Sequence, residues 1–164
     1  MKALTKGRAL AQRLTDILDE AGPKLSNVTE AEASRAHAPG KWSSKQIVGH
    51  LIDSAINNHA RFVRAQLQDD LVFPGYDQDA WVRVQRYDLR AWSELVNDWR
   101  VYNRRIAALM GATPDAELDR PRPRHNLHEI GFQPLPSGTD ATLGFLMSDY
   151  IVHLHHHLRR VLKP

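Results

Sequence analysis

The spacing of histidines near the C-terminus is the feature of this sequence that most directly suggests chemistry. The stretch from Asp149 to Arg160 holds four of the nine histidines. On an α-helix, at ~100° per residue, His153 and His157 lie in or at the edge of the apolar face, whereas His155 and His156 point away from it. Two imidazoles four residues apart lie on one face with ~5–6 Å between their Cβ atoms, which suits two ligands of one metal ion. A metal site needs at least one further ligand from elsewhere in the chain.

The same histidine pair could also arise without a metal site, in two ways. A histidine triplet near a C-terminus can be a purification tag, but Leu158, Val161 and Leu162 continue the apolar period beyond it, so we reject a tag. Two core histidines that are satisfied by hydrogen bonds would show the same spacing. From this pair alone, a structural role and a metal site stay equally open.

Length and composition predict one soluble globular domain over residues 1–164, with 42% hydrophobic and 25% charged residues. The chain has no cysteine, so a metal site must use nitrogen and oxygen ligands, and any thiol chemistry needs a thiol from outside. The net charge of +3 is modest and the cations are scattered, which argues against a nucleic-acid-binding surface. No stretch approaches the ~20 apolar residues of a membrane span, and we expect a cytoplasmic protein without a membrane partner.

Apolar residues at helical spacing predict four long helices and no strand. The first should end at Gly22-Pro23, and the third at Gly111. A single helical turn is expected within residues 24–41, a short helix from Asp77 through Gln85, and a brief helix at residues 113–117, before a long loop over residues 119–138. The long helices are expected at about residues 5–21, 43–68, 90–110 and 140–162. This pattern predicts an all-α, four-helix bundle whose core can hold a site between facing helices.

The second long helix supplies the natural third ligand. It opens with a capping box formed by Ser43 and Gln46. His50 borders its apolar face, and a polar strip containing Ser54, Asn57 and Arg61 descends the helix from there. Such a strip is either a pocket wall or a solvated flank, and for Ser54 alone the flank is the favoured interpretation.

Candidates for substrate contacts lie on three elements. Asn57 and Arg61 come from the polar strip, and Tyr150 lies at the centre of the inward face of the last helix. Tyr76, Asp77 and Trp81 belong to an aromatic loop of the kind that often covers a pocket, although the two aromatic rings could equally plug the end of the bundle.

Several charged residues could support such a site. Asp149, four residues before His153, could orient that imidazole or could face solvent. In the long loop, three arginines could bind an anionic substrate, but the favoured interpretation is that they are solvated surface residues. The two loop histidines are possible metal ligands by residue type, but their loop position gives them no fixed geometry. These loop residues are Arg120, Arg122, Arg124, His125 and His128.

Several motifs in this order resemble the DinB family, in particular its branch of DinB-like metal-dependent hydrolases and thiol transferases similar to YfiT. The resemblance covers nearly the whole chain and lies in the order and spacing of the histidines. The motifs are Lys41-Trp42-Ser43, Gly49-His50-Leu51-Ile52-Asp53-Ser54, Asn57-Asn58, Arg61-Phe62, the loop Tyr76-Asp77-Gln78-Asp79-Ala80-Trp81, and His153 with His157.

The resemblance implies an up-down-down-up four-helix bundle, usually a homodimer, in which His50, His153 and His157 hold a divalent metal ion. It also implies low-molecular-weight thiols such as bacillithiol, mycothiol or glutathione as cosubstrates in transfer or isomerisation reactions. The family name refers to DNA damage, but no DNA role is inferred from it.

Three neutral imidazoles leave a coordination position open for water or substrate, as in catalytic metal sites. A metal ion there can lower the pKa of bound water towards ~7 and would act likewise on a thiol. We expect zinc or nickel in such an all-nitrogen site. No carboxylate stands at His-Glu-x-x-His spacing, so the motif supplies no general base. The resemblance, together with this chemistry, therefore implies a metal-dependent thiol S-transferase acting on small electrophiles, with a metal-dependent hydrolase as its close rival. A non-catalytic metal-binding stress protein and a purely structural role for the histidines remain open.

Overall fold

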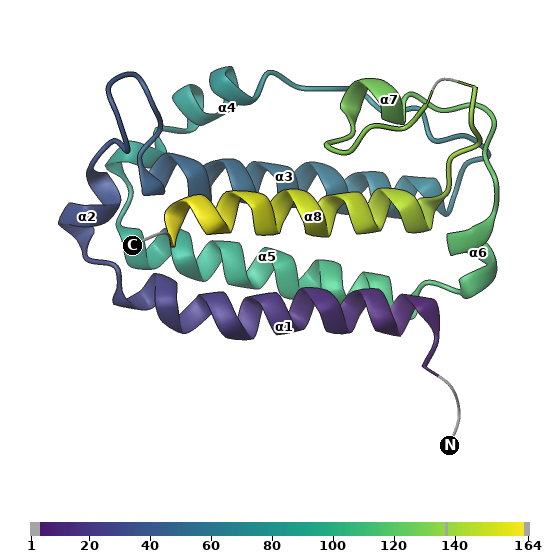
Figure 1. The fold of residues 1–164 in the computed structure, drawn as a ribbon, viewed down its shortest axis with the longest axis horizontal. Coiled ribbons are helices and arrows are strands. Elements are labelled where there is room, and N and C mark those ends of the chain that lie inside the picture. Colours follow the sequence, from purple (N-terminus) through teal and green to yellow (C-terminus); the bar gives the residue numbers. More distant parts are fainter. Residues whose placement is uncertain (1–3, 137, 163–164) are drawn as a thin grey trace.

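Four long helices lie side by side along the molecule (Figure 1). The computed structural model describes residues 4–136 and 138–162. Followed along the chain, the first and last of these helices run in one direction and the two middle ones in the other, which is the up-down-down-up order. The four are α1 (Lys6–Asn27), α3 (Ser44–Ala65), α5 (Trp92–Ala112) and α8 (Leu143–Val161). The described residues form isolated β-bridges but no strand, so the prediction of an all-α four-helix bundle is confirmed.

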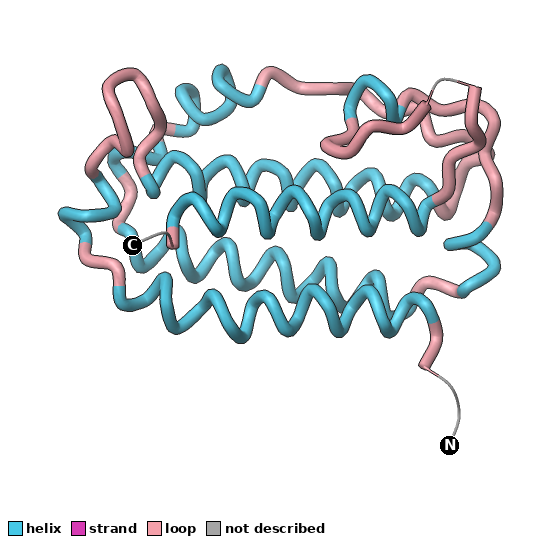
Figure 2. Tube along the Cα trace, viewed as in Figure 1, coloured by secondary structure: helices cyan, strands magenta, loops and turns pink. Residues whose placement is uncertain are grey.

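Short helices occupy the connections between the long ones. Figure 2 shows that the loops flanking α4 and α7 pass along the α3 side of the bundle. No helix in the described ranges is long and apolar enough to cross a membrane. The short elements are α2 (Glu30–Ser34), α4 (Gln78–Gln85), the 3₁₀ turn η1 (Tyr87–Leu89), α6 (Asp115–Asp119) and α7 (Leu127–Ile130).

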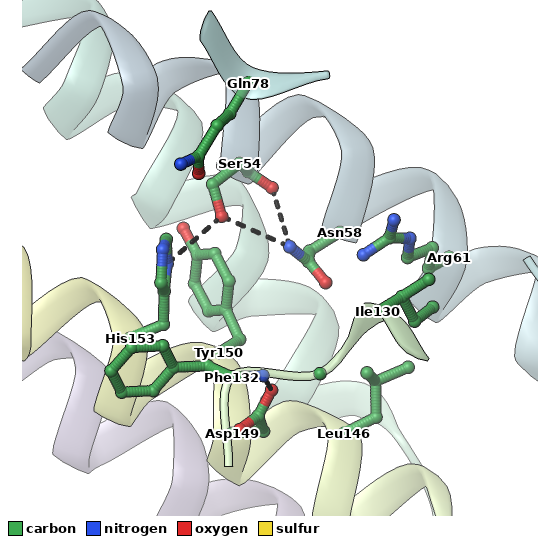
Figure 3. Close-up of a pocket in the computed structure, with 11 residues that line it drawn as sticks. Ser54, Asn58, Arg61, Gln78, Ile130, Phe132, Leu146, Asp149, Tyr150 and His153 are labelled. Carbon is green, nitrogen blue, oxygen red and sulfur yellow. Dashed lines mark hydrogen bonds between the residues drawn. The ribbon is translucent and has the colours of Figure 1, made fainter. Parts of the chain in front are cut away.

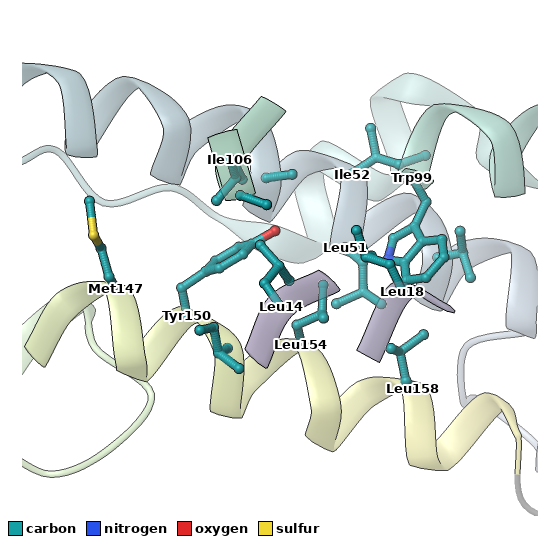
Figure 4. Close-up of a cluster of buried hydrophobic side chains, with 14 of the residues drawn as sticks. Leu14, Leu18, Leu51, Ile52, Trp99, Ile106, Met147, Tyr150, Leu154 and Leu158 are labelled. Carbon is teal, nitrogen blue, oxygen red and sulfur yellow. The ribbon is translucent and has the colours of Figure 1, made fainter. Parts of the chain in front are cut away.

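The core lies between the four long helices, which contact one another in the ring α1, α5, α3, α8. Leu14 from α1, Leu51 from α3 and Trp99 from α5 are fully buried there, together with Leu154 from α8 (Figure 4). Burial of each such side chain contributes roughly 1.5–3 kcal/mol to folding. The inward faces of α3 and α8 are therefore fixed by their apolar neighbours, which also fixes the direction of the polar groups between them.

The predicted helix caps at Ser43 and Asp77 are confirmed in detail. At the start of α3, the backbone N–H of Gln46 donates to Ser43 Oγ. The backbone N–H of Ser43 donates to the side-chain Oε1 of Gln46 at 2.9 Å, which completes the capping box. The Asp77 carboxylate accepts from the Ala80 amide at 3.0 Å and so begins α4.

The predicted end of the first helix at Gly22-Pro23 is wrong, because α1 continues to Asn27. Proline disfavours the helical conformation of the preceding residue through a clash with its Cβ, and Gly22 has none. The last turn is held from outside, since Leu25 is fully buried and its carbonyl accepts the Trp92 indole N–H at 2.8 Å. Tertiary contacts thus outweigh the local stop signal.

The second long helix, α3, ends at Ala65, three residues earlier than predicted. Arg122 binds this end of the helix, since its guanidinium donates to the carbonyls of Ala65 and Gln68, both at 3.1 Å. The expectation that Arg122 is a solvated residue is wrong, since it is only 1% exposed. A buried arginine therefore ties the long loop to the end of α3.

The η1 turn packs directly on α3 one turn from His50. The Tyr87 hydroxyl donates to Asp53 Oδ1 at 2.6 Å, and the side-chain amide of Gln85 donates to the same oxygen. Burial raises the pKa of Asp53 to about 6, although both donors act in the opposite direction. The Tyr87 ring lies over Gly49, where an added Cβ would be 2.1 Å from Tyr87 Cδ2. Glycine is required here because helix and ring come too close for any side chain.

Substitution of Gly49 by alanine should therefore destabilise the fold. We expect Gly49→Ala to lower the free energy of unfolding by about 1–3 kcal/mol, because the aromatic ring must move. Gly111→Ala is the matched control, since its Cβ would meet Ala11 Cβ at an ordinary 3.4 Å. Urea denaturation followed by circular dichroism should show that the control changes the free energy of unfolding by less than about 1 kcal/mol. Equal effects of the two substitutions would contradict this role of Gly49.

Candidate metal centre and the cavity beside it

Three histidines meet between α3 and α8. His50 comes from α3 and faces His153 and His157, which lie one turn apart on α8. The ring centroid of His50 lies 5.1 Å from that of His153 and 4.8 Å from that of His157. His50 Nε2 is 3.1 Å from His153 Nε2, and one ligand nitrogen from each of the three residues lies within 4.8 Å of the others. The structure thus brings together the three residues that the sequence analysis selected as ligands.

Burial keeps these imidazoles neutral. His50 is 2% exposed, and loss of water lowers its pKa to about 4. Burial, followed by the neighbouring imidazoles, lowers the pKa of His153 and of His157 to about 3. At neutral pH all three rings therefore keep a nitrogen lone pair that can bind a metal ion.

The remaining ring nitrogens indicate that a divalent cation fits this cluster. Nδ1 of His50 and Nδ1 of His157 are buried without a hydrogen-bond partner, whereas Nδ1 of His153 lies 3.5 Å from Ser54 Oγ. Buried polar atoms without partners are uncommon in folded proteins. A nitrogen-rich set of three neutral ligands is typical of zinc and nickel sites, and three protein ligands leave a position for another molecule.

A cavity of about 170 Å³ begins at His153 and extends between α3 and the loop after α7 (Figure 3). The α3 helix forms one wall, α8 forms another, and Gln78 enters from α4. The lining residues are Ser54, Asn58, Arg61, Gln78, Ile130, Gly131, Phe132, Leu146, Asp149, Tyr150 and His153.

Two of the six predicted substrate-contact residues, Arg61 and Tyr150, line this cavity. The Tyr150 hydroxyl is buried and donates to Asn103 Oδ1 at 2.5 Å, so its ring rather than its hydroxyl is the more available surface. The other four lie outside the lining, and a substrate role for them stays a prediction. Of these, Asn57 bonds to the Asp53 carbonyl, Asp77 caps α4, and Tyr76 packs against Trp81 with ring centroids 5.0 Å apart.

Ser54, Asn58 and Gln78 are cavity residues that the sequence analysis did not select. The assignment of Ser54 to a solvated flank is wrong, since it is buried beside His153. Ser54, Asn58 and Arg61 stand at positions i, i+4 and i+7, so helical periodicity alone could have placed them on one wall. Gln78 had no such signal, because its position depends on how α4 docks.

Asp149 holds the loop that closes the cavity. Its carboxylate accepts the Phe132 amide at 2.9 Å and the Gln133 amide at 2.6 Å. Both expectations for Asp149 are therefore wrong, because it neither orients His153 nor faces solvent. The anchored Phe132 ring lies 5.3 Å from the His153 ring and 5.1 Å from the His156 ring.

The other candidates in the long loop do not reach the histidine cluster. His125 contacts His128 and pairs through Nε2 with the Thr139 carbonyl at 2.7 Å. Arg120 pairs with Asp69, and exposed Arg124 pairs with Asp70, so these two arginines belong to the surface, as expected.

Comparison with known proteins identifies a family and several relatives to which this chain is similar. The model of the DinB superfamily matches residues 8–161. A Bacillus subtilis protein named "Putative metal-dependent hydrolase YfiT" is 24% identical over 149 residues, which are 88% of this chain and 78% of that protein. A relative of the same description from Oceanobacillus iheyensis is 28% identical over 133 residues, covering 81% of this chain and 74% of its own. The solved structure of YfiT superimposes with a TM-score of 0.75 at 21% identity and covers 98% of this chain and 87% of that one, which supports the fold.

Removal of the Asp149 carboxylate should release the loop over the cavity. We expect Asp149→Ala to lose about 1–3 kcal/mol of stability, because two amide donors lose their charged acceptor. Amide hydrogen exchange should accelerate most strongly at Phe132 and Gln133, with a smaller effect in Asp149→Asn, which retains one acceptor oxygen. Unchanged exchange at those two amides would contradict this anchoring role.

Proton competition with metal at the histidine cluster should begin only in acid. Because the pKa values of the three imidazoles are lowered to about 3–4, the zinc dissociation constant should change less than about tenfold between pH 7 and pH 5. Three ligands with an ordinary pKa of ~6.5 would instead weaken binding by roughly 1,000-fold or more over this range. Competition with a chelator at each pH, with circular dichroism to verify folding, distinguishes the two cases.

Proposed function

Since this chain belongs to the DinB superfamily, we propose that it is a metal-dependent enzyme, specifically a low-molecular-weight-thiol S-transferase acting on small electrophiles. In this proposal His50, His153 and His157 hold a zinc or nickel ion at the end of the cavity. A bound ion would supply Lewis acidity that lowers the pKa of a thiol or water.

The use of Asp149 is the observation that carries the choice of a thiol over water. Among the described residues that line the cavity, Asp149 is the only carboxylate, and both of its oxygens accept backbone amides. Water, with a pKa near 15.7, needs a strongly Lewis-acidic metal ion and commonly a general base to become a nucleophile. A thiol, with a pKa of ~8.5, needs much less assistance. Since the chain has no cysteine, that thiol arrives as a cosubstrate.

The surrounding residues prepare the site for such a reaction. Trp42 packs at 5.3 Å from the His50 ring, and Phe132 covers His153, so both exclude water from the imidazoles. Ser54, beside Nδ1 of His153, helps to orient that ring. Asn58 and Arg61 continue the wall into the cavity and offer polar contacts to a substrate.

Metal-dependent hydrolysis is the second candidate. The names of the two relatives above favour it, since both are described as hydrolases that depend on a metal. A hydrolase would act without added thiol, whereas a transferase would not.

Thiol dependence can be tested with untagged protein loaded with zinc or nickel. The assay follows conjugation of monochlorobimane to glutathione, bacillithiol, mycothiol or cysteine. We expect faster conjugation with at least one thiol, and His153→Ala should lose both the metal and at least about 100-fold of that rate, because one of three ligands is missing. Elemental analysis of both proteins accompanies the kinetics.

His155→Ala is the matched control, because His155 lies on the same helix but is exposed and outside the cluster. It should retain metal and rate. Ester or amide hydrolysis without thiol would replace the transferase with the hydrolase, and absence of metal from the wild-type protein after reconstitution would overturn both enzyme candidates.

A further inference from the structure

Arg61 is a buried cation that has no acidic partner among the described residues. It is 7% exposed and lies on the cavity wall formed by α3. Among the described residues no carboxylate lies within ion-pair distance of it, and its only hydrogen bond runs from Nη2 to the Pro74 carbonyl at 3.0 Å. Burial lowers the pKa of Arg61, but a guanidinium remains charged at neutral pH. A buried charge without a counterion is costly unless something else compensates it.

The geometry around Arg61 is that of a binding wall rather than of a structural tether alone. A guanidinium has five N–H donors, and the bond to Pro74 uses one of them. In Figure 3 the guanidinium points towards Asn58, along the wall that leads to Ser54 and His153. Asn58 directs its amide N–H groups at Ser54, which leaves its carbonyl oxygen as the more available atom.

Other arginines of the chain show what a structural role looks like here. Buried Arg122 donates to two carbonyls and pairs with Glu117 at 3.2 Å. Asp149 lines the same cavity as Arg61, but it does not pair with Arg61. Its two carboxylate oxygens accept the backbone amides of the loop instead. Arg61 therefore keeps its charge available to a molecule inside the cavity.

We propose that Arg61 forms a carboxylate-binding subsite, so that the electrophilic substrate is a small organic anion with its reactive carbon towards His153 and its carboxylate at Arg61. This proposal rests on the proposed function, because that function places the reacting atoms at the histidine cluster. Guanidinium and carboxylate form two parallel hydrogen bonds, which favours this anion chemistry.

The dimensions of the cavity limit the size of that anion. Arg61 stands seven positions after Ser54 on α3, which corresponds to roughly 10 Å along the helix axis. A cavity of about 170 Å³ is slightly larger than the engineered cavity of roughly 150 Å³ that holds one benzene molecule. A substrate with one ring or a short chain between its reactive carbon and its carboxylate fits these limits.

The test uses binding of an unreactive pair, so that it does not depend on turnover. The probes are 4-methylbenzoate and its neutral analogue 4-methylbenzamide, titrated by NMR into the zinc-loaded protein. We expect the carboxylate to bind at least tenfold more tightly than the amide. Arg61→Gln should abolish this preference, and Arg61→Lys should restore part of it. Arg64→Gln, on the exposed side of the same helix, should keep the full preference as the matched control.

Three results would overturn the subsite. These are equal affinity of both probes for the wild-type protein, a preference that persists in Arg61→Gln, and a preference that disappears equally in Arg64→Gln. Persistence in Arg61→Gln together with loss in His153→Ala would place the carboxylate at the metal instead. If the preference depends on Arg61 but neither monochlorobimane nor the carboxylate-bearing electrophile 4-(bromomethyl)benzoate is conjugated to a thiol, the subsite stands and the proposed reaction fails. If Arg61→Gln does not fold, the metal-free wild-type protein decides instead: a preference that persists without zinc supports Arg61, and a preference that disappears without zinc overturns the subsite.

Discussion

The packing of α3 against α8 is the constraint on which the rest of the structure depends. It holds three imidazoles within ligand distance of one another, in a place where burial keeps them unprotonated. One imidazole comes from α3 and two come from α8, so a small shift of one helix along the other would separate the nitrogens. Leu51 and Leu154, which are fully buried on these two helices in the same core, help to hold that register. The hydrophobic core and the polar cluster are therefore two results of the same helix contact.

Helical periodicity made the centre of this site predictable. His50, His153 and His157 each stand on or beside an apolar face, and the helices that carry them are long enough for the pattern to be unambiguous. The caps at Ser43 and Asp77 are local in sequence and were equally accessible. Features that depend on a few neighbouring residues could thus be derived before the structure was known.

Features that depend on distant partners could not be derived in this way. Pro23 remains helical because Trp92, far along the chain, holds the last turn of α1. The direction of Asp149 depends on two loop amides whose position has no periodic signal. Arg122 is buried because its loop returns to the end of α3. In each case a long-range hydrogen bond decides the outcome, and the sequence alone does not reveal which partner will be near.

The direction of the two middle helices has a consequence for how such a protein can diversify. Because α3 and α5 run parallel, the chain must travel back along the bundle between them, and this return carries α4 with Gln78. The second long connection carries α7 and Phe132. Both segments lie outside the helix ring, so the backbone that carries the three histidines belongs to α3 and α8 and not to these connections. The topology thus assigns the histidine cluster to the helix ring and part of the cavity wall to two connections, so a change in the cavity need not change the histidines.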